Sequence, residues 1–111
     1  MESKTLHEIC LALNVTRRMV QGYEKAGLVC ASSKNKYGHL LYDEKTCQRI
    51  VRIRWLQRIG FKLKEIKDII DAPMDVMKNA LEKQLLQLHK DKEEIEVCIQ
   101  KAMEFIHDLN S

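Results

Sequence analysis

Four cysteines and four histidines are the side chains of this 111-residue chain that could hold a metal ion or act in catalysis. They stand at Cys10, Cys30, Cys47, Cys98, His7, His39, His89 and His107. No two cysteines lie two to four residues apart, the usual spacing of zinc ligands and redox pairs. No histidine has a cysteine or carboxylate partner at a repeating spacing. We therefore expect no metal site, no cofactor and no enzymatic activity.

A second group of side chains suits recognition better than catalysis. Thr16, Arg17, Arg18 and Gln21 stand close together in the chain. Arginine can pair with guanine and glutamine with adenine, and both can bind a phosphate. We expect this group to contact double-stranded DNA if one helix presents it to one surface. The alternative is an ordinary helix pair with a solvated basic face.

The segment around this group has the start and stop signals of two short helices. Thr5 and Glu8 form a capping box, and Asn14 suits the left-handed turn that ends a helix. Thr16 is a good cap for the second helix, which Gly27 ends. The expected buried face of that helix is Val15, Met19, Val20 and Tyr23. Two short helices and a tight turn match a helix-turn-helix, in which the start of the second helix reaches base edges.

Residues 28–42 predict a two-stranded ribbon after the helix pair. Leu28-Val29 and Leu40-Leu41-Tyr42 flank a stretch rich in turn-forming residues, and we expect the two apolar segments to pair. A basic, aromatic loop beside a helix-turn-helix is typical of a wing that contacts the DNA backbone. The residues expected to contact DNA from this ribbon are Lys34, Lys36, Tyr37, His39 and Tyr42.

Three further helices are predicted. Asp43 caps the first, with apolar positions at Ile50, Ile53, Trp55 and Leu56; the second carries Leu63, Ile66, Ile69 and Ile70. Pro73 then precedes a helix from about Met74 to Leu109, in which one stripe has spacings of four and three residues through to the end. We call this stripe the seam; it consists of Leu81, Leu85, Leu88, Lys92, Ile95, Ile99, Ala102, Ile106 and Leu109.

A helix of this length extends far beyond what so small a core can cover, so we expect the seam to pair with a second copy. An antiparallel pair places Leu81 against Ile106, Leu85 against Ala102, Leu88 against Ile99 and Lys92 against Ile95. A parallel pair would instead place Lys92 against Lys92. The predicted organisation is a basic domain over residues 1–72 and a dimerisation helix over residues 73–111.

Charge is divided in the same way. The net charge of +3 is unevenly distributed. Residues 1–70 contain 14 Lys/Arg and 7 Asp/Glu, whereas residues 71–111 contain 5 Lys/Arg and 9 Asp/Glu. A basic body with an acidic tail indicates that the first part meets a polyanion, the alternative being a solubility pattern without a partner. No apolar run approaches 18 residues and the first residues lack the pattern of a signal peptide, so we expect a cytoplasmic protein without membrane contact.

Several strings of residues in this order resemble the MerR family of bacterial transcription regulators. They are Val20-Gln21-Gly22-Tyr23-Glu24-Lys25-Ala26-Gly27-Leu28, Tyr42-Asp43 and Ile59-Gly60-Phe61-Lys62-Leu63-Lys64-Glu65-Ile66. The resemblance implies a mainly α fold, with a winged helix-turn-helix followed by a long helix that forms an antiparallel coiled coil. It also implies a homodimer that binds a pseudo-palindromic promoter site, distorts the DNA and acts with RNA polymerase, and it adds Lys62 as a backbone contact.

The chain departs from the family pattern in its expected DNA contacts. Gln21 and Gly22 stand where the family has Arg and Tyr, and Gly38-His39-Leu40 replaces the wing's Gly-Tyr-Arg. These departures leave open whether the protein activates or represses. They also support a second interpretation, in which the same fold is a dimeric protein-interaction module with weakened DNA binding.

Overall fold

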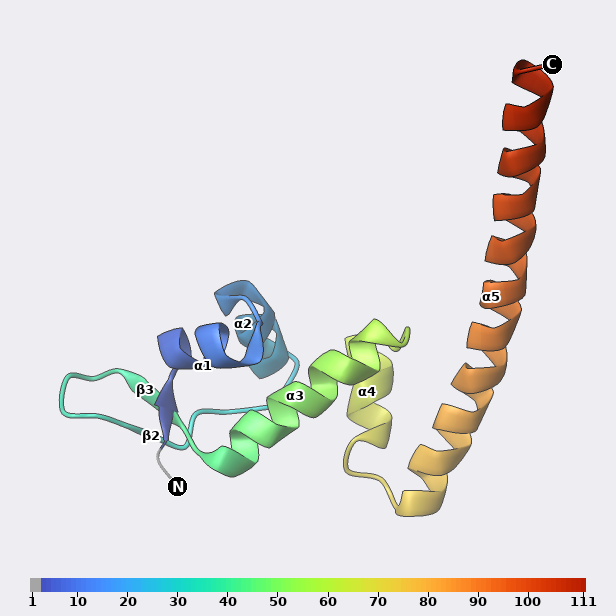
Figure 1. Ribbon diagram of the computed structural model, residues 1–111. Helices are drawn as coiled ribbons and strands as arrows, with labels where there is room; N and C mark the ends of the chain where they lie inside the picture. Colours follow the sequence, from blue (N-terminus) through green and yellow to red (C-terminus); the bar gives the residue numbers. More distant parts are fainter. Residues whose placement is uncertain (1–2) are drawn as a thin grey trace. The chain divides into compact units, whose positions relative to one another are not determined.

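The computed structural model describes residues 3–111, in two compact units, Met1–Pro73 and Met74–Ser111 (Figure 1). The second unit consists of one long helix and the residues that follow it. The elements are β1 (Lys4–Thr5), α1 (Leu6–Leu13), α2 (Arg17–Lys25), β2 (Ser33–Lys34), β3 (Leu40–Tyr42), α3 (Glu44–Arg58), α4 (Leu63–Ile69) and α5 (Met74–Leu109). The fold is mainly α with a small antiparallel wing, as predicted.

Local capping signals place the first two helices where the sequence predicts them. The backbone N–H of Thr5 donates to Glu8 Oε1 at 3.0 Å, and the N–H of Glu8 donates to Thr5 Oγ1 at 3.3 Å. Asn14 ends α1 with a φ of 53°, in the left-handed region that asparagine tolerates. The N–H of Met19 donates to Thr16 Oγ1 at 3.0 Å and thereby fixes the start of α2.

The sheet differs from the predicted ribbon. Its order is β1-β3-β2, and all neighbours are antiparallel, with Thr5 and Ser33 both opposite Leu41. The predicted pairing of Leu28-Val29 with β3 is wrong. Both residues lie outside any strand and are buried, at 2% and 7% exposure. The turn at Gly27, with a φ of 77°, directs them into the core, so their side chains pack there and β2 pairs with β3 instead.

The apolar core lies entirely within the first unit. Among the described residues, 14 hydrophobic side chains are buried, and the first and last of them are Ile9 and Ile70. From α3 the core receives Cys47, Ile50, Ile53 and Leu56. Trp55, expected on the apolar face of this helix, is instead 51% exposed. Its position between Ile53 and Leu56 turns it away from the face that those residues share, since helical neighbours in sequence point in different directions.

Helix α5 contains no buried residue along its 36 positions. Leu85, Ile95 and Ile106 of the seam are 54–59% exposed. The N-terminal end of the helix has a shallow apolar hollow that includes Leu81 and Leu85. Among the helices of residues 3–111, none combines the length and the hydropathy that a membrane span requires.

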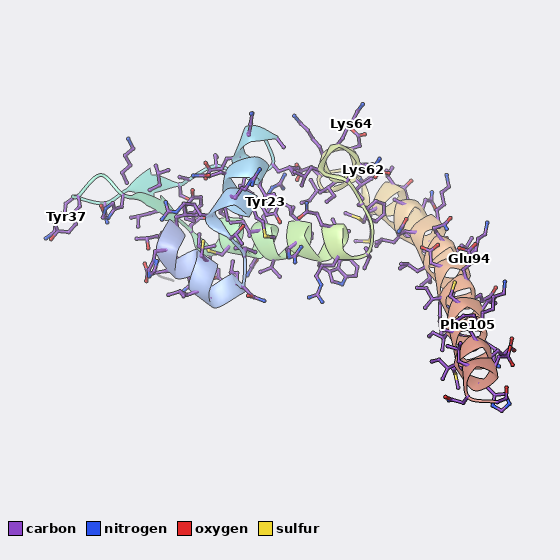
Figure 2. All side chains as sticks on the ribbon, turned by 90° about the horizontal axis from the view of Figure 1, so that it is seen from above. Tyr23, Tyr37, Lys62, Lys64, Glu94 and Phe105 are labelled. Carbon is purple, nitrogen blue, oxygen red and sulfur yellow. The ribbon has the colours of Figure 1, made fainter. Side chains whose placement is uncertain are left out.

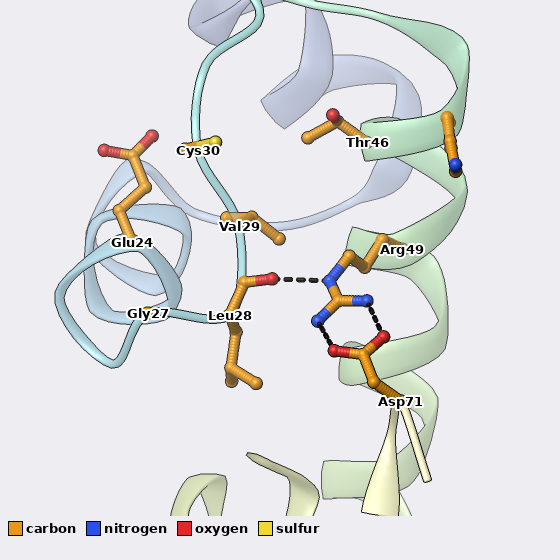
Figure 3. A pocket seen from close by; sticks show the side chains of 9 residues that line it. Glu24, Gly27, Leu28, Val29, Cys30, Thr46, Arg49 and Asp71 are labelled. Atoms are coloured by element: carbon orange, nitrogen blue, oxygen red, sulfur yellow. Dashed lines mark hydrogen bonds and ion pairs between the residues drawn. The ribbon is translucent and has the colours of Figure 1, made fainter. Parts of the chain in front are cut away.

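One arginine ties distant parts of the first unit together. The Arg49 guanidinium, on α3, donates through Nη1 and Nη2 to the Asp71 carboxylate at 2.6 and 2.8 Å, and through Nε to the carbonyl oxygen of Leu28 at 2.5 Å (Figure 3). The three groups line a cavity of about 450 Å³ that also includes Gly27 and Cys30. The bidentate contact holds the segment after α4 against α3, and the hydrogen bond to Leu28 does the same for the end of the helix-turn-helix.

Replacing Asp71 by Asn tests this contact. We expect the free energy of unfolding at pH 7 to fall by no more than about 1 kcal/mol, since the Asp71 side chain is 71% exposed. Hydrogen bonding from Arg49 lowers the pKa of Asp71 below its ordinary value of 3.8. The stabilisation is therefore present above pH 3.8 and disappears as the pH falls through the lower pKa of the folded state.

The measurement is urea unfolding of parent and variant at one protein concentration, between pH 7 and pH 3. The two stabilities should converge at the acidic end. Asp68→Asn, a change at an exposed carboxylate on α4, is the matched control and should match the parent at both ends. A difference between parent and the Asp71 variant that is independent of pH would contradict the assignment.

Candidate nucleic-acid interface

The start of α2 presents the DNA-contact residues that the sequence predicts. Thr16, Arg17, Arg18 and Gln21 are all exposed, whereas Val20 and Tyr23 of the same helix are buried at 0% and 1%. Burial of one face thus fixes which face is offered to a ligand. The positive end of the helix dipole adds to the attraction for an anion.

The hairpin between β2 and β3 holds a second group. Asn35 organises its turn, because its Oδ1 accepts the backbone N–H groups of Tyr37 and His39 at 2.9 and 3.0 Å. Gly38 completes the turn with a φ of 82°, a conformation that glycine adopts without strain. Tyr37 lies at the tip of the hairpin and points away from the helices (Figure 2).

Side chains of the hairpin tip also contact one another. The Lys36 ammonium nitrogen lies 5.1 Å from the centre of the Tyr37 ring, and the rings of Tyr37 and His39 are 6.4 Å apart between centroids. Lys34, Lys36, Tyr37 and His39 are all exposed. The hairpin therefore offers two ammonium groups, a phenol and an imidazole on one short segment, which suits contact with phosphates.

Tyr42 does not belong to this surface, and its prediction as a DNA contact is corrected here. Its side chain is 1% exposed, and its hydroxyl donates a hydrogen bond to the Glu24 carboxylate. Burial, followed by the bond to Glu24, raises the pKa of Tyr42. Tyr42 is the last residue of β3, shortly before α3, and its side chain packs in the core, whereas Leu40, on the same face of the strand two residues earlier, stays exposed.

Lys62 stands at the cap position of α4, where its backbone N–H donates to Glu65 Oε1 at 2.9 Å. Its side chain is exposed, and so is that of Lys64 in the same turn; Figure 2 shows both extending from this end of α4. The sequence analysis predicted only Lys62 as a contact. Lys64 could have been included, because it is a second lysine only two residues later.

The structure also brings together residues that the sequence keeps far apart. A cavity of about 260 Å³ is lined by Thr5, Leu6, His7, Arg17 and His39. Arg17 and His39 were predicted contacts, but His7 was not, because no spacing in the chain links it to either of them. Among residues 3–111, no three His, Cys, Asp or Glu side chains are grouped so that they could hold a metal ion.

The amino-acid sequence of this chain is similar to those of known proteins. Residues 4–73 match the family model described as MerR HTH family regulatory protein. The nodulation protein NolA of Bradyrhizobium elkanii is 33% identical over 91 residues, which are 82% of this chain and 39% of NolA. The chain thus spans well under half the length of this relative.

Two solved structures have a similar fold. The N-terminal part of MtaN, the multidrug transporter activator of Bacillus subtilis, has a TM-score of 0.73 at 27% identity, covering 93% of this chain and 97% of that one. HiNmlR, a MerR family regulator lacking the sensor domain and solved on promoter DNA, has a TM-score of 0.74 at 19% identity, covering 89% and 80%. The second likeness concerns the fold alone. With the family model matched over the whole first unit except its first residues, this chain belongs to the MerR family of helix-turn-helix regulatory proteins.

Proposed function

We propose that this protein is a homodimeric transcription regulator that binds a pseudo-palindromic promoter site and distorts the DNA between its half-sites. The observation that carries the proposal is the orientation of α2. Its buried Val20 and Tyr23 leave Arg17 and Arg18 exposed on the first turn, the part of a recognition helix that meets base edges in the major groove. HiNmlR, which has a similar fold, was solved with promoter DNA.

Two phosphate-binding groups flank this helix in the proposal. The hairpin contributes Lys34, Lys36, Tyr37 and His39, and the start of α4 contributes Lys62. Each neutralised phosphate releases condensed counterions, so these residues supply affinity that depends on salt but not on sequence. Base recognition is left to Arg18 and Gln21, with Thr16 and Arg17 beside them.

Dimerisation is assigned to the seam of α5. In a single copy none of its apolar residues is buried, and a second copy provides the simplest cover. The Lys92 Nζ lies 3.9 Å from Oε1 of Glu96, which is one turn later on the same helix. In the antiparallel arrangement the Lys92 stem packs on Ile95 of the second copy while the ammonium group stays beside carboxylates. In this proposal residues 1–72 bind DNA and residues 73–111 hold the dimer, so that RNA polymerase meets a promoter bent by two linked DNA-binding units.

A second candidate function is a dimeric protein-interaction module with weakened DNA binding. The specific observation in its favour is Gly22, on α2 next to the exposed Gln21. A Cβ at Gly22 would meet no atom within 4 Å, so there is room for a side chain that the protein does not have. Binding of the promoter of its own gene, in a gel-shift experiment with a scrambled duplex beside it, separates the two functions.

Arg17→Ala and Arg18→Ala should each weaken binding to that promoter. An arginine that reads a base, as proposed for Arg18, contributes about 1–3 kcal/mol, and its loss should relax specificity at one base pair. Fluorescence anisotropy at moderate salt measures both effects. Lys101→Ala, on α5 outside the seam, is the control and should bind like the parent. Unchanged affinity in both arginine variants would mean that α2 does not read the DNA.

Lys34→Ala, Lys36→Ala and Lys62→Ala should weaken binding to promoter and scrambled duplexes alike. Each removes one phosphate contact, so the slope of log affinity against log salt should fall by about one unit per variant. A salt titration of each variant against both duplexes provides the measurement. A loss confined to the promoter would assign the lysine to base recognition instead.

The direction of pairing in α5 can be read from a photo-crosslink. Benzoylphenylalanine in place of Ile106 should crosslink to the region around Leu81 of the second copy, because the antiparallel seam puts these positions side by side. A parallel pair would crosslink near position 106 instead. Mass spectrometry of the crosslinked peptides distinguishes the two, and the same probe at Lys101, on the outer face, should give little crosslinked dimer. A monomer by light scattering would exclude both arrangements.

A further inference from the structure

The cavity of about 260 Å³ joins three elements of the first unit through side chains that can carry positive charge. His7 comes from the first turn of α1, Arg17 is the first residue of α2, and His39 directly precedes β3. Thr5 and Leu6 complete the lining, which contains no carboxylate. A hollow lined by a guanidinium, two imidazoles and a hydroxyl is suited to an anion.

Backbone pairing explains why these residues meet. Thr5 of β1 is the antiparallel partner of Leu41 in β3, so His39, two residues before Leu41, is carried to the start of α1. The capping box of Thr5 and Glu8 holds the first turn of α1, and the Thr16 cap holds Arg17. The three side chains are thus placed by hydrogen-bonded backbone, although each is itself exposed.

We propose that His7, Arg17 and His39 form a binding site for one phosphate of the DNA backbone, at the junction of the helix-turn-helix and the wing. This proposal rests on the proposed function and adds His7 to the DNA-binding residues. The cavity is smaller than the roughly 300–1,000 Å³ pockets that take drug-sized ligands, and a phosphate is a small anion. Among residues 3–111, no ion pair uses the guanidinium of Arg17.

Charged groups of β1, α1 and the hairpin lie around the site. Lys4 and Glu8 lie on β1 and α1, while Lys36 and Tyr37 lie beside His39 in the hairpin. Hydrogen bonds to Thr5 lower the pKa of Glu8, so this carboxylate keeps its negative charge near His7 throughout the neutral range.

The test measures DNA affinity of the full chain at one pH, with promoter and scrambled duplexes. In the double variant His7→Gln, His39→Gln the affinity should fall several-fold. The loss should be the same for both duplexes, because a phosphate carries no sequence information. The matched control His107→Gln on α5 should bind like the parent. A double variant that binds both duplexes like the parent would overturn the proposal.

A second measurement does not depend on DNA binding. Titration of the free parent protein with inorganic phosphate, followed by NMR, should shift the imidazole signals of His7 and His39 together and leave that of His107 unchanged. If the parent fails to bind either duplex, the proposed function fails while the phosphate titration still decides the anion site. Movement of neither imidazole, or of only one of the two, would overturn the site even in a protein that binds DNA.

Discussion

Burial of apolar side chains is restricted to one part of this protein, and the rest of the structure depends on that restriction. Every buried hydrophobic residue among those described lies between Ile9 and Ile70, and α5 has none. Each such side chain contributes about 1.5–3 kcal/mol when fully buried. The first unit therefore has its own source of stability, whereas α5 offers an apolar seam that only another surface can cover.

The same core orients the candidate interface. Tyr23 and Tyr42 are the largest fully buried side chains among residues 3–111. Their hydroxyls donate hydrogen bonds to Gln57 and Glu24, so neither hydroxyl is left unpaired in the core. Because Tyr23 and Val20 anchor one face of α2, Arg17 and Arg18 are held on the other. The hydrogen bonds of the sheet then bring the hairpin beside α1. The exposed side chains of the candidate interface are thus positioned by side chains that are buried in the core.

Charge follows this division. The unit with the core carries the excess of Lys and Arg, and α5 carries the excess of Asp and Glu. Under the proposed function the two signs act in different ways: the basic unit approaches the phosphates, and the acidic helix stays away from them while it joins two copies. Gln21 and Gly22 give α2 less bulk and charge than the Arg and Tyr of the family pattern. The phosphate contacts proposed for the hairpin and for the His7 site therefore become more important for affinity.

Local signals in the sequence predicted the helices, because caps and turn residues act over three or four positions. Thr5, Asn14, Thr16 and Gly27 marked the ends of α1 and α2, and Pro73 together with the repeating apolar pattern indicated a helix from about Met74 to Leu109, the range of α5. The family resemblance followed from strings of the same local kind. Contacts between distant residues obey no such short spacing. Only the tertiary structure decided the pairing of β1 with β3, the burial of Leu28 and Tyr42, and the exposure of Trp55. It also decided that His7 lies close to Arg17 and His39. Each of these features depends on which side chains pack into the one small core.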